Sequence, residues 1–287
     1  MGYKPPKAIA KAGIETGATK ARLSWDKALV AGFLAGAYIA FAGLLAFTVT
    51  AGMPERIWGT LPSFFTGAVF SLGLILVIIA GSELLTGNMA LVPLAAMRGR
   101  ASLKRLVENW MFVLVGNLLG SLFVAYFLAV KTGVGTAELP LERLGGIAHK
   151  KAVEETELQI FLRGLGCNWL VCLGVWMALA AEDIAGKVLA IFFPIMAFVA
   201  MGFDHVVANM FFIPAAIWAG VPDLTWWDAL HNWIFAFLGN AAGATIFVAG
   251  AYWFLYAQTV EEEPGDTPSG APERAPEPEP EPVGRRA

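Results

Sequence analysis

Long apolar stretches, separated by short polar ones, occupy most of the 287-residue chain. About 20 successive apolar residues are enough to cross the hydrocarbon core of a bilayer. Six stretches reach that length, near residues 29–52, 64–97, 105–130, 156–181, 188–220 and 226–257. The second and fifth are much longer than one crossing requires, and each has polar residues near its middle. The pattern predicts an all-α integral membrane protein with six transmembrane helices, of which the second and fifth are broken.

The two polar passages repeat one another. GSELLTGNMALVP at 81–93 aligns without a gap with GFDHVVANMFFIP at 202–214, and NWMFVLVGN at 109–117 aligns with NWIFAFLGN at 232–240. The chain therefore consists of two homologous halves with three spans each. Because three is an odd number, the halves insert in opposite directions and form inverted repeats. Interrupted spans at matching positions of inverted repeats are typical of membrane transport proteins.

Four polar residues at the breaks have structural explanations. Glu83 and Asp204 occupy equivalent positions, where a carboxylate can accept hydrogen bonds from the exposed backbone N–H groups of a restarting helix. Asn88 and Asn209 are also equivalent, and we expect them to cap that helix. Gly81 and Gly202 permit the turn. We therefore expect these acids and amides to maintain the breaks rather than to contact a solute.

His205 is the one histidine deep within a predicted span. An imidazole can change its charge near physiological pH, and ionisable groups inside a membrane usually face a pathway. The alternative is a histidine that only holds helices together through a hydrogen bond. The hydroxyl of Thr86 in the first break can meet a solute opposite His205, although such hydroxyls often bond the local backbone. Asn117 and Asn240 can bond to a helix break or line a lumen.

Composition supports the membrane assignment and divides the chain into three parts. Hydrophobic residues make up 57% and charged residues 15%, against about 25% charged in soluble domains. The polar, lysine-bearing residues 1–28 form a predicted cytoplasmic segment, in which 7–23 have the mixed pattern of a helix on the membrane face. We expect residues 29–257 to form the six-span membrane domain, and the Pro/Glu-rich residues 258–287 to form a disordered acidic tail on the cytoplasmic side. The distribution of Lys and Arg predicts that both termini are cytoplasmic.

Two other classes of membrane protein fit less well. A membrane redox enzyme needs haem or metal ligands, but Cys167 and Cys172 have neither disulfide nor zinc spacing, and we expect no metal, no cofactor and no enzymatic activity. A neutral-solute facilitator of the aquaporin type shares the inverted halves. It usually has paired Asn-Pro-Ala segments and a constriction arginine, which are missing here. The net charge of −3 gives no indication of a nucleic-acid partner.

Three segments resemble the signature regions of the formate/nitrite transporter family. They are FSLGLILVIIAGSELLTGNMALV at 70–92, CNWLVCLGVWMA at 167–178 and MGFDHVVANMFFIP at 201–214, and the resemblance extends over about 8–257. It implies a homopentamer of six-span protomers in the cytoplasmic membrane, with an aquaporin-like fold. Each protomer would have its own pore for small monovalent anions such as formate, nitrite or hydrosulfide.

The resemblance also implies roles for individual residues. It makes His205 the central pore histidine and Thr86 its partner. The remaining implied pathway residues are Phe70, Leu74 and Phe198 at a cytoplasmic-side constriction, Leu84, Leu85 and Val171 near the loop and a periplasmic-side constriction, and the pore-facing Asn168 and Asn240. Either Lys150 or Lys151 would be the vestibule lysine. Two residues depart from the family pattern, because Asp204 stands where many members have Glu and Leu85 stands where the formate channel has Phe.

These observations together predict a mechanism. A bare anion in an apolar constriction loses several kcal/mol of hydration, whereas its neutral conjugate acid loses much less. We expect basic groups to attract the anion and His205 to supply or relay a proton during passage. Formate is the first candidate and nitrite the second, with hydrosulfide or another small weak acid as the alternative. The sequence leaves the preferred anion and the coupling to protons open.

Overall fold

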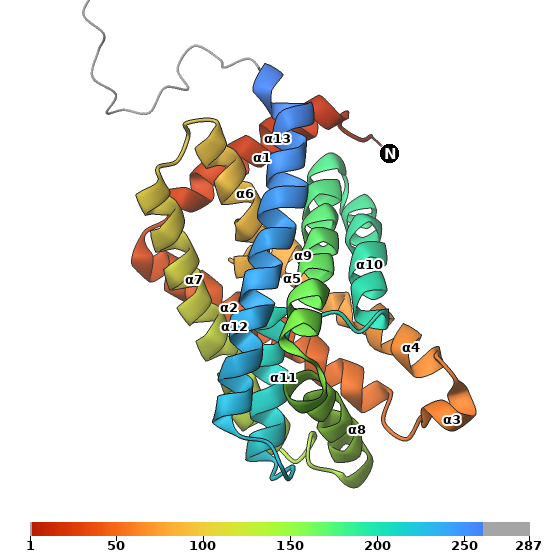
Figure 1. The fold of residues 1–287 in the computed structure, drawn as a ribbon. Coiled ribbons are helices and arrows are strands. Elements are labelled where there is room, and N and C mark those ends of the chain that lie inside the picture. The colour runs from red at the N-terminus through yellow and green to blue at the C-terminus, as the bar shows by residue number, and fades with distance from the viewer. Residues whose placement is uncertain (1, 261–287) are drawn as a thin grey trace, which may run out of the picture.

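The computed structural model describes residues 2–260, so most of the predicted tail lies outside the described residues. The chain folds into a bundle of helices (Figure 1). In chain order the elements are α1 (Pro6–Ala21), α2 (Trp25–Val49), α3 (Glu55–Trp58), α4 (Leu61–Phe70), α5 (Leu72–Ala80), α6 (Leu85–Met97), α7 (Leu103–Phe123), η1 (Val124–Val130), α8 (Glu138–His149), η2 (Lys150–Glu154), α9 (Glu157–Ala180), α10 (Ile184–Ala200), α11 (Val206–Trp218), α12 (Trp226–Ala244), η3 (Thr245–Gly250), α13 (Ala251–Leu255) and η4 (Ala257–Thr259).

Several helices are suited to a bilayer by length and composition. Within residues 2–260, five helical segments are long and apolar enough to cross a membrane, namely Trp25–Val49, Leu61–Ala80, Leu103–Val130, Glu157–Ala180 and Trp226–Leu255. The helices α6, α10 and α11 are apolar but shorter. The expected all-helical membrane protein is confirmed. The stretch predicted as a fifth span, 188–220, is formed by two helices, α10 and α11.

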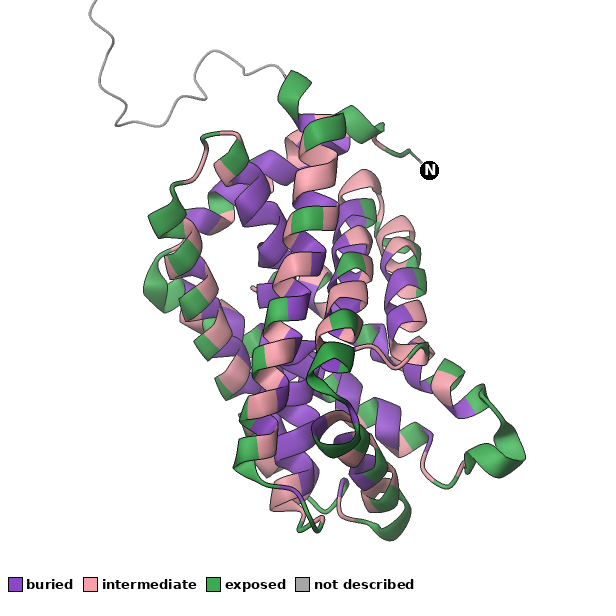
Figure 2. Ribbon diagram, in the orientation of Figure 1, coloured by how far each residue is buried: buried purple, intermediate pink, exposed green. Residues whose placement is uncertain are grey.

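Two chain segments interrupt the bundle at matching places. Residues 81–84 separate α5 from α6, and residues 201–205 separate α10 from α11. The backbone leaves the helical path at Gly81 and Gly202, whose φ angles of +80° and +73° are strained for any residue with a Cβ. Every residue in 85–95 of α6 and in 206–216 of α11 is buried (Figure 2). Two short helices therefore begin inside the protein and form much of its core.

Close helix contacts hold the bundle in the same way in both halves. A Cβ on Gly120 of α7 would lie 2.0 Å from the carbonyl oxygen of Phe33 in α2. A Cβ on the equivalent Gly243 of α12 would lie 2.2 Å from the carbonyl oxygen of Leu165 in α9. Without a hydrophobic force between helices in lipid, such small residues allow the backbones to approach.

The two ends of the bundle are covered by different elements. The helix α1 crosses one end, where α13 also lies, and α3 and α8 lie at the opposite end (Figure 1). The buried side of α1 includes Ile9, Ile14 and Gly17, and a Cβ on Gly17 would lie 1.9 Å from the Leu91 carbonyl oxygen of α6. The predicted surface helix over 7–23 is therefore a helix, and it packs against the protein.

Candidate functional site

A cavity of about 380 Å³ opens at the end of the bundle where α3 and α8 lie. We call it the α8 vestibule. Its polar wall comes from the chain around α8 and η2, and its floor consists of apolar residues and one imidazole. The lining includes Glu55, Arg143, Lys150, Lys151, Glu155, Phe70, Phe198 and His205.

A second cavity, of about 560 Å³, lies beside α1. We call it the α1 vestibule. It also combines charged and apolar residues, and its lining includes Glu15, Lys20, Glu83, Lys187, Leu74 and Leu84. In the α1 vestibule Lys20 lies beside Glu83, the acid just before α6, and in the α8 vestibule Lys150 and Lys151 lie beside Glu154 and Glu155.

A hollow of about 10 Å³ lies between the vestibules, and we call it the constriction. That volume is close to the least that can hold one water molecule. Its lining comprises Ile39, Phe70, Leu74, Leu84, Val171, Ile195, Phe198 and His205. It shares Phe70, Phe198 and His205 with the α8 vestibule, and Leu74 and Leu84 with the α1 vestibule. The three hollows therefore lie in series.

The structure divides the predicted constriction residues between the two vestibules, and it places Leu74 with Leu84 in the α1 vestibule. The resemblance implied that Phe70, Leu74 and Phe198 lie at a cytoplasmic-side constriction, and that Leu84, Leu85 and Val171 lie near the loop and a periplasmic-side constriction. In the structure, Phe70 and Phe198 share the α8 vestibule with Lys150 and Lys151, whereas Leu84 shares the α1 vestibule with Lys20. The reason is the direction of the chain. The stretch from α4 to α6 starts beside α3 and runs toward α1, so Phe70 is reached before Leu84.

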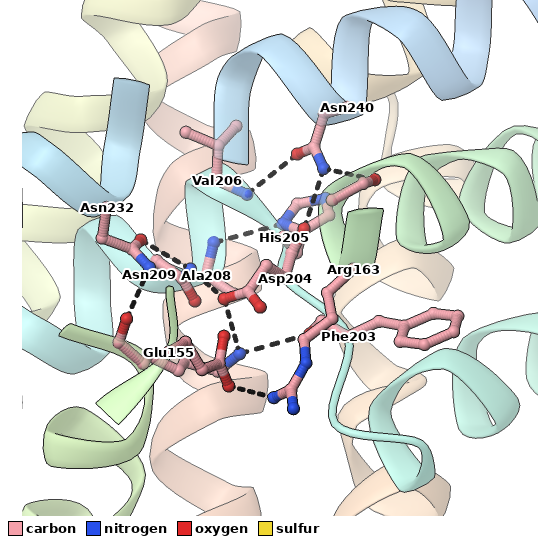
Figure 3. A network of polar contacts seen from close by, with 12 residues as sticks. Glu155, Arg163, Phe203, Asp204, His205, Val206, Ala208, Asn209, Asn232 and Asn240 are labelled. Atoms are coloured by element: carbon pink, nitrogen blue, oxygen red, sulfur yellow. Dashed lines mark hydrogen bonds and ion pairs between the residues drawn. The ribbon is translucent and has the colours of Figure 1, made fainter. Parts of the chain in front are cut away.

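His205 is the N-cap of α11, and only 2% of the residue is exposed. Its Nδ1 accepts the backbone N–H of Ala208 at 3.1 Å (Figure 3). The ring proton is therefore on Nε2, which lies 2.9 Å from the Thr86 hydroxyl and can donate to it. The imidazole also stacks on Phe198, with 6.0 Å between ring centroids. The predicted pair of His205 and Thr86 is thus brought together as a neutral, hydrogen-bonded unit.

The backbone around Thr86 is fixed by α9. Nδ2 of Asn168 donates to the Thr86 carbonyl at 3.1 Å and to the Asn240 carbonyl at 2.8 Å. The thiol of Cys172 lies 3.3 Å from the same Thr86 oxygen. Asn168 therefore links α6 to α12. Leu85 and Val171, both predicted near the pathway, are buried, and Val171 lines the constriction.

Two asparagines from neighbouring helices anchor the starts of α6 and α11. Oδ1 of Asn117 accepts the Leu85 N–H, and Oδ1 of Asn240 accepts the Val206 N–H, each at 2.9 Å. Each Nδ2 donates to two backbone carbonyls, those of Gly32 and Glu83 for Asn117, and those of Gly164 and Asp204 for Asn240. Of the two roles open to these amides, the structure shows that both bond to the helix breaks.

The predicted capping by Asn88 and Asn209 was wrong. Both lie in the first turn of their helices, and the N-caps are Leu84 and His205. Their Nδ2 atoms instead donate at 2.8 Å to the side chains of Glu83 and Asp204. These acids were expected to accept backbone N–H groups, but among the described residues they accept from side chains, those of a lysine and an asparagine in each case. The cap position is taken because the Asn117 and Asn240 amides reach the first helical N–H.

A lysine completes each acid–amide pair. Nζ of Lys20 lies 2.8 Å from Glu83, and Nζ of Lys151 lies 2.9 Å from Asp204. Asn109 accepts from the Asn88 amide and donates to the Lys20 carbonyl. In the same way Asn232 accepts from the Asn209 amide and donates to the Lys151 carbonyl, and all four contacts are 2.8–2.9 Å long. Of the two candidate vestibule lysines, Lys151 makes the ion pair, and Lys150 lines the same cavity.

Sequence reasoning missed Lys20. The residue lies in α1, outside the segments in which the repeat is visible. Its equivalence to Lys151 could have been found by extending the repeat toward the N-terminus from Gly32 and Gly164, whose carbonyls accept from the matching asparagines. The spacing from lysine to glycine is one residue longer in the second half than in the first, and the π-helical segment η2 accommodates the additional residue.

An all-helical bundle with membrane-length helices, and with two vestibules meeting at a buried imidazole, defines a polytopic membrane transport protein. The family model for formate/nitrite transporters matches residues 7–254, and the chain belongs to this family. The resemblance found in the sequence is confirmed.

Several members of the family are similar to the chain along most of its length. The "Probable formate transporter" of Methanothermobacter thermautotrophicus is 47% identical over 269 residues, covering 88% of this chain and 97% of that protein. A solved "FNT family ion channel" has a TM-score of 0.79 and 31% identity, covering 86% of this chain and 98% of the other. A "Pentameric formate channel with formate bound" has a TM-score of 0.71 and 32% identity, covering 81% and 98%.

Proposed function

We propose that this protein is a channel for small monovalent anions, with formate preferred and nitrite second, and that His205 assists protonation of the anion during passage. The supporting observation is the position of the His205 ring, which lies at the junction of the α8 vestibule and the constriction and bonds to Thr86. The names of similar proteins, a probable formate transporter and a formate channel, support formate as the substrate.

We extend the proposal to the assembly. The pairs α5–α6 and α10–α11 each count as one broken span, which gives six spans in two inverted three-helix repeats of aquaporin-like arrangement. The protomers form a pentamer in the cytoplasmic membrane, with lipid around the assembly and both termini in the cytoplasm. The matching bonds made by Asn117 and Asn240 support the repeat, and the pentameric formate channel supports the oligomer.

The constriction sets the energetic problem. Its side chains are apolar apart from the imidazole, and its hollow accommodates about one water molecule. An anion must leave its hydration shell there, which costs several kcal/mol or more for a charge and much less for a neutral acid. Phe70, Leu74 and Phe198 therefore exclude the charged form while admitting the protonated one.

His205 and Thr86 have the geometry for a proton relay. Nε2–H and the threonine hydroxyl are hydrogen-bond donors for an anion that reaches the floor of the α8 vestibule. A proton taken up at Nδ1 breaks the bond from the Ala208 N–H and makes the ring an imidazolium. The imidazolium then gives its Nε2 proton to the anion, which becomes a neutral acid and moves into the constriction. The ring is left neutral with its one proton on Nδ1. Loss of that proton from Nδ1 and uptake of another at Nε2 restore the starting tautomer and the bond from the Ala208 N–H before the next anion arrives.

The vestibules supply the anion. Arg143, Lys150 and Lys151 lie around the α8 vestibule, and Lys20 and Lys187 around the α1 vestibule. Clefts lined by positive charge raise the local concentration of anions. The lysines that pair with Glu83 and Asp204 keep those acids from repelling the substrate.

Uptake of labelled formate into proteoliposomes tests the proposal. An inward proton gradient should increase the wild-type rate, unlabelled nitrite should compete, and His205→Asn should lower the rate at least tenfold, since one decade corresponds to about 1.4 kcal/mol of barrier. Protein-free vesicles measure diffusion of formic acid through the lipid. Uptake that ignores the gradient and survives His205→Asn unchanged would contradict the proposal.

A neutral-solute facilitator is the second candidate function, favoured by the apolar walls of the constriction. Vesicle swelling in glycerol compared with swelling in formate separates the two. Rapid swelling in glycerol with none in formate would replace the proposed function with this alternative, and hydrosulfide as competitor tests the remaining weak-acid substrate.

A further inference from the structure

The second half of the chain contains a buried acid that the proposed mechanism does not use. Glu155 lies between η2 and α9, just before the fourth membrane-length helix, and lines the α8 vestibule. Its side chain is 3% exposed. Oε1 forms an ion pair with Nη1 of Arg163, which lies in α9, eight residues further along the chain (Figure 3). A carboxyl group removed from water in this way is stable only if its oxygens have partners.

The second oxygen of Glu155 lacks a conventional donor. Among the described residues, Oε2 of Glu155 and Oδ2 of Asp204 are both buried without a hydrogen-bond partner. Lys151, which pairs with Asp204, and Glu155 belong to the same short stretch at η2, and the two carboxyl groups interact with each other electrostatically. Two neighbouring carboxylates each disfavour ionisation of the other, so one of them binds a proton more readily than a free carboxylate does. One proton between them supplies the missing donor and satisfies both oxygens.

The charges around Glu155 agree with a proton held there. Burial raises the pKa of Glu155 to about 7, the hydrogen bond to Asp204 and its charge act in the same direction, and Lys151 and Arg163 oppose them. Lys150 and Glu154 on η2 also line the vestibule. The acid is therefore neutral below about pH 7 and charged above it.

The first half of the chain has no counterpart to this pair. The N-caps Ser24 and Thr156 correspond, as do the bonded carbonyls of Gly32 and Gly164. In that alignment Leu23 stands opposite Glu155, and the residue opposite Arg163 is Ala31. The Lys20–Glu83 site is complete without them, so the scaffold does not require the additional acid and base.

We propose that Glu155 controls the charge of the α8 vestibule by holding a proton that it shares with Asp204 while an anion is captured. With the proton in place, Lys151 and Arg163 outweigh Asp204 by one charge. When the proton leaves, Glu155 cancels that excess. The inference rests on the proposed function, because it concerns how the anion reaches His205.

The consequence is an affinity for anions that depends on pH. One charge at about 10 Å, in surroundings of intermediate dielectric, alters the occupancy of an anion by roughly tenfold. Capture at the α8 vestibule is therefore strong below about pH 7 and weakens as the pH rises through that value. The effect concerns the half-saturating concentration of the anion rather than the maximal rate, because the constriction is unchanged.

Exchange of labelled formate with equal pH on both sides of the proteoliposome membrane tests this. For the wild type, the half-saturating formate concentration should rise roughly tenfold between pH 6 and pH 8. Glu155→Gln mimics the protonated acid, so its half-saturating concentration should stay low at both pH values. Glu154→Gln is the matched control, because it removes the same charge from an exposed neighbour on η2 and should retain the wild-type pH dependence. Equal pH dependence in the wild type and Glu155→Gln would overturn the inference.

Infrared difference spectroscopy gives a readout that does not depend on transport. Lowering the pH from 8 to 6 should produce the carbonyl band of a protonated carboxylic acid in the wild type and in Glu154→Gln, and this band should be missing in Glu155→Gln. A band that persists in Glu155→Gln would overturn the inference. If the wild type exchanges no formate at all, the proposed function fails, and the spectra still decide whether Glu155 binds the proton.

Discussion

The starts of α6 and α11 are assembled from the same parts, but only that of α11 presents a titratable ring to the constriction. In both, an asparagine from a neighbouring helix accepts a hydrogen bond from the first N–H of the helix. Next to this bond, a lysine, an acid and two asparagine side chains are connected by hydrogen bonds. At the N-cap itself, Leu84 of the first half stands where His205 stands in the second.

This comparison separates scaffold from chemistry. Parts that both halves share explain how a helix can begin inside a membrane protein, since freed backbone groups there need partners. Parts found in one half alone are candidates for function. His205 belongs to this second group, and so do Glu155 and Arg163.

The largest effect is expected from removing the shared anchors. Asn117→Ala and Asn240→Ala each remove one acceptor and two donated hydrogen bonds inside the bundle, which should cost about 3 kcal/mol or more in either half. Thermal unfolding in detergent measures this, with the exposed Met111→Ala as control. A large loss of stability for one of the two variants and a negligible loss for the other would contradict the structural equivalence of the two halves.

A smaller and unequal effect is expected from the two lysines. Lys151→Met leaves Asp204, whose side chain is 0% exposed, as an unpaired charge and should cost about 3 kcal/mol. Lys20→Met leaves Glu83, which at 13% exposure can be reached by water, and should cost about 1 kcal/mol. Melting temperatures compare the two. Adding Asp204→Asn should recover part of the Lys151→Met loss, and equal losses for the two lysines would contradict the difference in burial.

The smallest effect concerns pH and the second half alone. Since the pKa of Glu155 is raised from 4.5 to about 7, the folded protein binds a proton that the unfolded chain releases. The resulting stabilisation is present at low pH and is lost as the pH rises through about 7, by about 1–2 kcal/mol between pH 5 and pH 8. Glu155→Gln should flatten this part of the profile of melting temperature against pH. A wild-type melting temperature that rises between pH 5 and pH 8 would contradict the raised pKa of Glu155.

The sequence predicted the fold well because lipid selects for long apolar segments and the repeat marks equivalent positions. Gly81 and Gly202 mark the helix interruptions directly, since a positive φ favours glycine. His205 was singled out because an ionisable group is rare at the middle of an apolar stretch, and Thr86 because of its place in the first break and the family resemblance. The matching of Asn117 with Asn240 was also visible, and bonding to a helix break was one of the two roles that the sequence left open for them.

What the sequence did not predict depends on packing between distant segments. Lys20 reaches Glu83 from α1, and Arg163 reaches Glu155 across the start of α9, so neither pair follows from local periodicity. The roles of Asn88 and Asn209 were misjudged because a nearer acceptor from another helix occupies the cap.

Proton movement during formate uptake tests the central claim most directly. Proteoliposomes containing a trapped pH indicator and exposed to labelled formate should acidify inside by about one proton for each formate that enters, after subtraction of protein-free vesicles. His205→Asn should lower both signals together, at least tenfold. Formate that enters the wild-type vesicles without acidification, and at the same rate in His205→Asn, would contradict the account.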